Sequence, residues 1–369
     1  MEWTYLWSPA ALAVGLGVSS VHAEALIGSA APLTGQMSWL AEQHQRGVEL
    51  AVAELNATGG VLGETVAVVP VDDYCDGDQA VAAARKLVAD GVVAVVGHNC
   101  SGAAIPASAV YDEAGIVMIT GTATNPQLTD QGFRQTFRMV ARDTLQGAMA
   151  AEYIADRLAD RRIAILHDGQ AYGQGLAAAT KAELNRRGVT EALYEQITPG
   201  KADYADIVTE LEGAGIDVLF YGGYQPEAAL LIRQARDRGS DLQMIGSDAL
   251  FTEYFWHVAG PAAVGVRFVS MADARANQAA APVVAKFRAD GYEPEGLTLY
   301  SYATVQVWAQ AVEKAGTFHP EAVAEALHGE QFDTVLGQVG FDEKGDVYGY
   351  EPFTWYVWQE GDYAPLDGD

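Results

Sequence analysis

Small hydroxyl residues follow three apolar, strand-like runs in the first third of the sequence. Ser101, then Thr122 with Thr124, and less clearly Thr34 each come shortly after such a run. Because the carboxyl ends of parallel strands meet at one edge of a sheet, these hydroxyls and the neighbouring backbone N–H groups should converge there. Convergent donors of this kind can bind a carboxylate. Helix capping explains any one of these residues equally well, but their recurrence on successive strands favours a ligand site.

Acidic and aromatic residues take the corresponding places in the middle of the sequence. Tyr172, Tyr221, Tyr224 and Asp248 each lie close to the end of a strand-like run. A carboxylate with neighbouring tyrosines can hold an ammonium group by ion pairing and cation–π attraction. For Asp248 alone, a cap on the following helix is an equally good interpretation. One group of residues suited to a carboxylate and another suited to an ammonium describe a zwitterion, and an α-amino acid is the simplest such ligand.

Sequence patterns typical of catalysis are absent. There is no G-x-S-x-G, no G-x-x-x-x-G-K-[ST], no H-E-x-x-H and no G-x-G-x-x-G after a strand. The only nucleophile with a base nearby in the sequence is Ser101 with His98. Both His98 and His167 lie at strand ends, where a structural histidine is the commoner case. The sequence therefore favours a binding protein over an enzyme.

The composition is strongly acidic. Lys and Arg total 22 and Asp and Glu total 49, which gives a formal net charge of −27. Such a surface repels phosphate backbones, so nucleic acid is not an expected partner, and no basic helix-turn-helix is present for a DNA-binding regulator. Neither a metal nor a cofactor is expected, because no C-x-x-C pair occurs and only His98 lies near a cysteine.

The N-terminal segment has the features of a signal peptide. Residues 8–21 are apolar or small, the run is too short to span a bilayer, and it ends in a small-x-small sequence at 21–23. The leading segment carries Glu2 and no Lys or Arg, which is unusual for a signal peptide. We expect cleavage after Ala23, export to the periplasm and no lipid anchor, because the residue directly after the cleavage site is Glu24 and not a cysteine.

Only two cysteines occur, Cys75 and Cys100. In an exported chain an even pair most simply forms one disulfide. Two buried thiols and half of a metal site are the alternatives.

From Glu24 onward, short β-branched runs alternate with longer helix-like runs, and the alternation restarts near residue 162. Repeated β-α-β units imply parallel sheets covered by helices on both faces, so the sequence predicts an α/β protein with two doubly wound lobes. Expected strands are 25–30, 65–71, 92–97, 116–120, 136–140, 162–167, 191–197, 217–221, 243–246 and 265–270. Expected helices are 41–58, 79–90, 104–113, 147–159, 173–187, 203–214 and 226–238.

The C-terminal quarter differs from this pattern. Helices are expected at 280–289, 302–315 and 320–327, without a sheet of their own, followed by a strand at 354–358. These helices should pack on the first lobe, so that several crossovers join the lobes as a hinge with a ligand cleft between them. The predicted domains are a signal peptide at 1–23, lobe 1 at 24–141 plus 272–351, and lobe 2 at 142–271 plus 352–369.

Several short motifs occur along the mature chain. They are APLTG at 31–35, VDDYCD at 71–76 with QAV at 79–81, GHNCS at 97–101, ATNPQLT at 123–129, HD at 167–168 with YGQG at 172–175, YGGYQPE at 221–227 and FDEKGD at 341–346. Together these motifs resemble the leucine/isoleucine/valine-binding proteins of bacterial high-affinity importers. The likeness covers nearly all of the mature chain in collinear order and implies a type I periplasmic-binding-protein fold with three crossovers.

The resemblance assigns roles to individual residues. It implies that Ser101, the backbone at Thr122 and the hydroxyl of Thr124 hold the α-carboxylate and the α-ammonium. It implies that Tyr224 lies at the ligand head and that Tyr172 is an aromatic residue of the side-chain pocket. It also implies a disulfide between the two cysteines beside that pocket.

Three positions depart from the family pattern. Asp248 stands where the family usually has Glu against the ammonium, and Leu40 stands where an aromatic residue usually lines the pocket, although Trp39 is adjacent. Asn99 replaces an apolar residue that would touch an aliphatic ligand side chain, so Asn99 could pair with a polar ligand atom.

The function that the resemblance implies is a monomeric receptor that delivers a free amino acid, branched-chain or related, to the permease of an ABC importer. The alternatives are a periplasmic sensor of the same fold that signals to a membrane partner, and a receptor for a polar amino acid or amide instead of Leu, Ile or Val.

Overall fold

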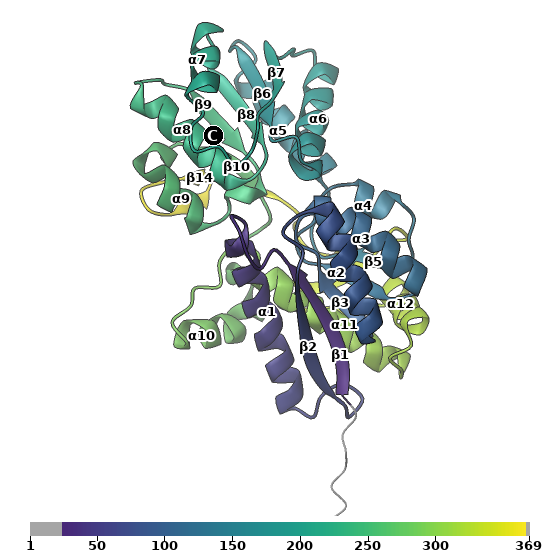
Figure 1. Ribbon diagram of the computed structural model, residues 1–369. Coiled ribbons are helices and arrows are strands. Elements are labelled where there is room, and N and C mark those ends of the chain that lie inside the picture. Colours follow the sequence, from purple (N-terminus) through teal and green to yellow (C-terminus); the bar gives the residue numbers. More distant parts are fainter. Residues whose placement is uncertain (1–23, 367–369) are drawn as a thin grey trace, which may run out of the picture.

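The computed structural model describes residues 24–366, which form two lobes joined by several chain segments (Figure 1). The predicted signal peptide lies outside the described residues. Within the described range no helix has the length and apolarity needed to cross a membrane.

The first lobe is built on a five-stranded sheet in the order β2-β1-β3-β4-β5. All neighbours pair in parallel, and Ile27 on β1 lies beside Val68 of β2 on one side and Ala94 of β3 on the other. The strands are β1 (Glu24–Ala31), β2 (Thr65–Asp72), β3 (Ala94–Gly97), β4 (Val117–Thr120) and β5 (Thr136–Arg138). The helices are α1 (Ser38–Ala57), α2 (Gly77–Asp90), α3 (Ser101–Ala114) and α4 (Gln127–Asp130).

Local sequence explains where these helices begin and end. The Asp76 side chain accepts the Gln79 N–H at the start of α2, and Gly91 ends that helix in a left-handed conformation with φ of 78°. Gly115 ends α3 in the same way, with φ of 69°. The chain therefore turns back toward the next strand directly after each helix.

The second lobe contains a seven-stranded sheet in the order β15-β14-β10-β9-β8-β6-β7. The strands from β10 to β7 pair in parallel, as predicted, and β14 and β15 add an antiparallel edge that the sequence pattern did not indicate. The strands are β6 (Ile163–His167), β7 (Leu193–Gln196), β8 (Val218–Gly222), β9 (Gln243–Gly246), β10 (Arg267–Ser270), β14 (Thr354–Trp358) and β15 (Tyr363–Pro365). The helices are α5 (Asp143–Arg157), α6 (Ala171–Arg186), α7 (Ala205–Gly213), α8 (Gln225–Asp237), the 3-10 turn η1 (Asp248–Leu250), α9 (Glu253–Ala259) and the 3-10 turn η2 (Gly260–Ala263).

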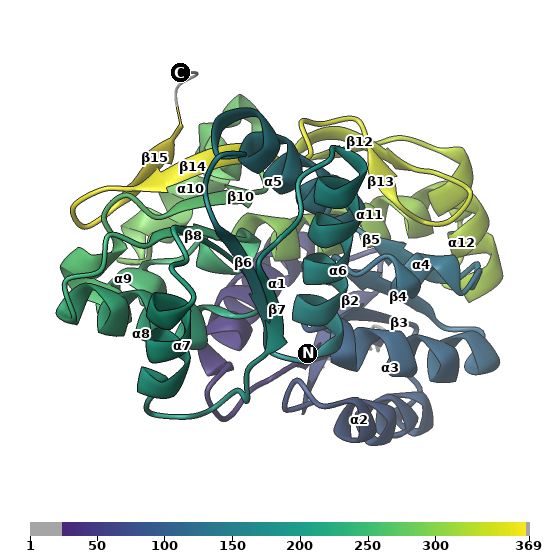
Figure 2. The same ribbon diagram turned by 90° about the horizontal axis from the view of Figure 1, so that it is seen from above.

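Helices cover both faces of this second sheet (Figure 2). Along β6, Ile163 and Ile165 pack in one apolar cluster with side chains of α5 and α6, while Ala164 and Leu166 pack in another with side chains of α7 and α8. Alternation of buried side chains with a period of two is what a strand between two helical layers requires. The predicted doubly wound arrangement is confirmed.

The C-terminal helices return to the first lobe, as predicted, because α11 packs against α1 and contacts β3 and β4. The expectation that this region has no sheet was wrong, since three short strands form an antiparallel sheet in the order β11-β12-β13. The elements here are the 3-10 turns η3 (Ala274–Ala276) and η4 (Gln278–Ala280), α10 (Ala281–Ala289), α11 (Thr298–Ala315), α12 (Pro320–Gly329), β11 (Phe332–Thr334), β12 (Gly337–Phe341) and β13 (Val347–Tyr348).

The chain crosses between the lobes after β5, after β10 and after β13. These three passages are the predicted three-crossover connection. The exact residue limits that we assigned to the lobes stay predictions.

Candidate ligand-binding site

A cavity of about 430 Å³, which includes its solvent-open side, lies between the two lobes. Residues of both lobes line it, and together they are Trp39, Leu40, Gln43, Asn99, Ser101, Thr122, Tyr172, Tyr224, Asp248, Ala249, Phe251 and Leu297.

The structure brings most of the predicted site residues together at this cavity. Thr124 is the exception among the proposed head-group residues, because it is fully buried and does not line the cavity. Sequence reasoning missed Gln43, Phe251 and Leu297. Gln43 could have been found, because it follows Trp39 by one helical turn on α1, and Leu297 has no local signal.

The first-lobe side of the cavity is formed by the ends of β3 and β4. Ser101 is the first residue of α3, where its hydroxyl does not cap its own helix but accepts the N–H of Asn125 at 3.2 Å. The Thr122 hydroxyl donates to the carbonyl oxygen of Asn99 at 2.7 Å. These two hydrogen bonds join the segment after β3 to the segment after β4. The hydroxyl residues of both segments therefore lie at the same edge of the sheet, as predicted.

A buried arginine that the sequence analysis did not single out fixes the loop after β4. Arg138 donates to the carbonyl oxygens of Ala123 and Asn125, at 3.2 and 2.9 Å, and its Nε donates to Asp346 at 2.6 Å. The Arg138 side chain is fully buried, so the charge is compensated by this carboxylate and these carbonyls. The loop that carries Thr124 is therefore held rigidly against the sheet.

The second-lobe side presents a carboxylate in a largely desolvated setting. Asp248 begins the turn η1 after β9, and its Oδ1 accepts the Tyr172 hydroxyl at 2.5 Å and the Gln146 amide at 2.9 Å. Burial raises the pKa of Asp248, while the hydrogen bonds from Tyr172 and Gln146 lower it. An arriving ammonium group would compensate this buried charge.

A second carboxyl group, missed in the sequence analysis, lies behind the first. Asp143 is fully buried at the start of α5, where its N–H donates to the Thr124 carbonyl oxygen at 3.0 Å. Burial raises the pKa of Asp143 well above its usual range, and the charge of Asp248 raises it further, whereas the neighbouring Thr124 hydroxyl lowers it. Asp143 and Gln146 are three residues apart on one helix face, so α5 brings both toward Asp248.

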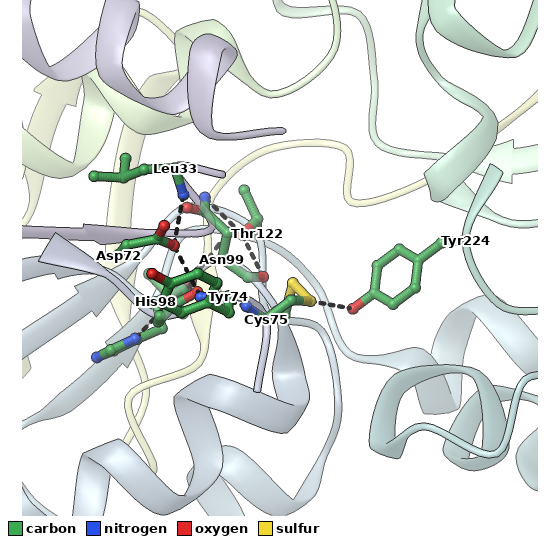
Figure 3. Close-up of a disulfide and its surroundings, with 11 residues drawn as sticks. Leu33, Asp72, Tyr74, Cys75, His98, Asn99, Thr122 and Tyr224 are labelled. Carbon is green, nitrogen blue, oxygen red and sulfur yellow. Dashed lines mark hydrogen bonds and ion pairs between the residues drawn. A yellow bond between two sulfur atoms is a disulfide. The ribbon is translucent and has the colours of Figure 1, made fainter. Parts of the chain in front are cut away.

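The predicted disulfide between Cys75 and Cys100 is present, with the two Cα atoms 5.3 Å apart. Figure 3 shows Tyr224 reaching it from the second lobe, with its hydroxyl 3.8 Å from Cys75 Sγ. The Tyr224 ring in turn packs against the Tyr172 ring at a centroid distance of 5.1 Å. Two tyrosines of the second lobe that pack against each other therefore line one wall of the cavity, and one of them reaches the disulfide of the first lobe.

His98 has no catalytic relation to Ser101. Both of its ring nitrogens are engaged in the interior, Nδ1 with Asp73 at 2.7 Å and Nε2 with the Tyr111 hydroxyl at 3.0 Å. The interpretation of His98 as a structural histidine is confirmed. His167 accepts the Gly169 N–H at 3.1 Å and is likewise a local structural residue.

Comparison with known proteins identifies the family. The sequence pattern of the family described as periplasmic binding protein matches residues 25–361. The chain is 43% identical over 362 residues to a Leu/Ile/Val-binding protein homolog of Brucella suis, and the alignment covers 97% of this chain and 98% of that protein. The chain belongs to the periplasmic binding protein family. The named relative is described as a binding protein, and the family description refers to the periplasm.

Further relatives of this periplasmic binding protein also align over nearly the whole chain, and two of them have solved structures with the same fold. It is 44% identical over 364 residues to an amino acid binding protein of Pseudomonas aeruginosa, with 96% of this chain and 97% of that protein covered. A leucine-binding protein from Thermotoga maritima superposes with a TM-score of 0.84 at 24% identity, over 93% of this chain and 97% of that one. A substrate-binding protein from Desulfitobacterium hafniense in complex with Leu superposes with a TM-score of 0.76 at 27% identity, over 93% and 100%.

The two lobes of this binding protein also contact each other at the rim of the cavity. Glu295, which precedes α11 of the first lobe, accepts the Thr252 hydroxyl at 3.0 Å and the Glu253 N–H at 2.9 Å, both from the second lobe. Gln43 of α1 approaches the same Thr252 hydroxyl at 3.5 Å. We call this group the rim contact. It can form only while the lobes are close together.

Proposed function

We propose that this protein is the extracytoplasmic receptor of an ABC importer and that it binds a free α-amino acid between its lobes. The observation that carries the proposal is a single cavity with the hydroxyl residues Ser101 and Thr122 of the first lobe on one side and Asp248 with Tyr172 on the other. These groups match the carboxylate and the ammonium of one zwitterion. The protein would be a monomer that is exported with cleavage near Ala23 and docks on membrane permease subunits, with no nucleic acid partner.

The roles of the site residues follow from their positions. Ser101 and the backbone at Thr122 would hold the α-carboxylate, Asp248 the α-ammonium, and Tyr224 the ligand head. Thr124 does not line the cavity, so it would contribute indirectly, through its hydroxyl beside Asp143. The relatives support an amino acid ligand, since the Desulfitobacterium protein is described in complex with Leu.

A thermal-shift screen tests the proposal. The unliganded protein would be heated with each proteinogenic amino acid, and with analogues of the best ligand that lack either the amino or the carboxyl group. A ligand at 100 times its Kd stabilises the folded state by about 2.7 kcal/mol. We expect a shift with at least one amino acid and none with either analogue. If no amino acid shifts the melting temperature, the proposal is wrong.

Ligand should also close the lobes, because the proposed head-group contacts come from both of them. We expect the radius of gyration measured by small-angle X-ray scattering to fall when the confirmed ligand is added at saturation. The same protein with an amino acid that gives no thermal shift is the control. An unchanged radius of gyration at saturation would argue against closure about a hinge.

The rim contact should make closure sensitive to pH. Burial raises the pKa of Glu295 to about 7, the hydrogen bonds from Glu253 and Thr252 lower it, and the charges of Glu253 and Arg275 act in opposite directions. Opening the lobes would expose Glu295 and return its pKa toward 4.5. The closed form therefore takes up a proton between about pH 7 and 4.5, so closure and affinity should increase as the pH falls through this window.

We expect the Kd of the wild-type protein to fall by roughly tenfold or more between pH 8 and pH 5, relative to the Glu295→Gln variant, which cannot titrate there. Calorimetry at several pH values gives both curves, and their difference removes contributions from other titrating groups. Glu360→Gln, at an exposed position before β15, is the matched control and should keep the wild-type curve. If Kd depends on pH in the same way in the wild type and in Glu295→Gln, titration of Glu295 does not affect closure.

A further inference from the structure

The hydrogen bonds of Asn99 leave one atom of this buried side chain without a partner. Asn99 lies between the end of β3 and the disulfide, is 3% exposed, and lines the cavity. Its Nδ2 donates to the Thr122 hydroxyl at 3.2 Å, while its Oδ1 accepts no hydrogen bond from any residue of the described range. Figure 3 shows Asn99 beside Thr122, above the disulfide.

The orientation of this amide follows from the single proton of Thr122. The Thr122 hydroxyl donates its proton to the main-chain carbonyl oxygen of Asn99 at 2.7 Å. It has no second proton for the Asn99 side chain and can only accept a hydrogen bond from it. The side-chain atom next to Thr122 must therefore be the amide nitrogen. The acceptor Oδ1 is left as the unsatisfied atom of a residue that lines the cavity.

Trp39 adds a donor to the same cavity. It lines the cavity from α1, and its indole Nε1 is buried without an acceptor among residues 24–366. The other residues that line the cavity away from Asp248 and the hydroxyls are largely apolar, namely Leu40, Ala249, Phe251 and Leu297. No charged side chain lines the cavity except Asp248, which the proposed function assigns to the α-ammonium.

We propose that the ligand is an uncharged amino acid whose side chain carries a hydrogen-bond donor, a primary amide or a hydroxyl, that pairs with Asn99 Oδ1. This inference rests on the proposed function and specifies its ligand class. A hydrocarbon side chain would leave the buried acceptor unpaired, at a loss of roughly 5- to 150-fold in affinity. An anionic side chain would place a second negative charge near Asp248, and a cationic one would find no counter-ion of its own.

Two pairs of amino acids of nearly equal shape test this inference. Asparagine and leucine differ in the polarity of the side chain, as do threonine and valine. We expect calorimetry on the wild-type protein to show that one polar member binds at least tenfold more tightly than its apolar counterpart. In Asn99→Leu the ratio of the two affinities should fall by tenfold or more.

Trp39→Phe provides a second measurement in case Asn99→Leu does not fold, because it keeps an aromatic ring and removes the indole N–H, whose acceptor would be the oxygen of the ligand's amide or hydroxyl. The same affinity ratio should fall in this variant too. Asn185→Leu, at an exposed position on α6, is the matched control and should keep the wild-type ratio. A wild-type preference for leucine and valine, or a ratio that does not change in the folded variants, would overturn the inference while leaving amino acid binding intact. Absence of binding by every amino acid would instead overturn the proposed function.

Discussion

The Asp248→Ala variant should lose affinity for every amino acid, whatever its side chain, by about 2–5 kcal/mol. The carboxylate of Asp248 lies at the cavity wall, where burial raises its pKa. No other charged side chain in the described part of the chain lines the cavity, so none can take over its role. Removing it would leave the ligand ammonium buried without a charged partner. Calorimetry with the ligand found in the screen, and with two amino acids of different side chains, measures the loss.

Two further variants separate charge from shape. Asp248→Asn keeps the size of the side chain and an acceptor for the Tyr172 and Gln146 hydrogen bonds, so a comparable loss in this variant would assign the effect to charge. Asp241→Ala, at an exposed position before β9, is the matched control and should bind normally. Unchanged affinities in Asp248→Ala would show that the ammonium lies elsewhere.

Much of the fold was predictable because each lobe repeats one local pattern. Strands buried on both faces read as short apolar runs, and helices between them read as longer Ala- and Leu-rich runs. Helix starts were the weak point. The helix predicted from residue 147 begins at Asp143, and the one predicted from residue 104 begins at Ser101. The first turn of α5 is mostly polar and so lacks the helical spacing of apolar residues by which helices were recognised. Asp143 and Gln146 were missed for this reason.

The remaining errors concern contacts between residues far apart in the sequence. The sheet of β11, β12 and β13 consists of strands of two to five residues, too short for an alternating pattern to be read. Glu295 and Leu297 lie in an irregular segment, and only packing across the lobes brings them to the cavity rim. By contrast, the residues that follow strand ends were predictable, because parallel pairing alone determines the sheet edge at which they meet.

Removal of the disulfide should have the largest effect on stability. Cys75 and Cys100 are 25 positions apart, and closing a loop of this size stabilises the folded state by about 3 kcal/mol in the chain-entropy model. The bond also holds a turn in which Tyr74 and Cys75 both have positive φ, at 54° and 58°. The carboxyl groups of Asp72 and Asp73 accept the N–H groups of these two residues, at 3.0 and 2.8 Å, so part of the turn persists without the bond.

We expect a variant with both cysteines replaced by serine to unfold in urea with a free energy about 3 kcal/mol below that of the oxidised wild type. Dithiothreitol should lower the midpoint of the wild type toward that of the variant and leave the variant unchanged, which controls for effects of the serines themselves. Ligand affinity should fall as well, because Asn99 and Ser101, which line the cavity, are the two chain neighbours of Cys100. Equal urea midpoints for the oxidised wild type and the variant would mean that the hydrogen bonds from Asp72 and Asp73, and not the disulfide, determine the stability of this turn.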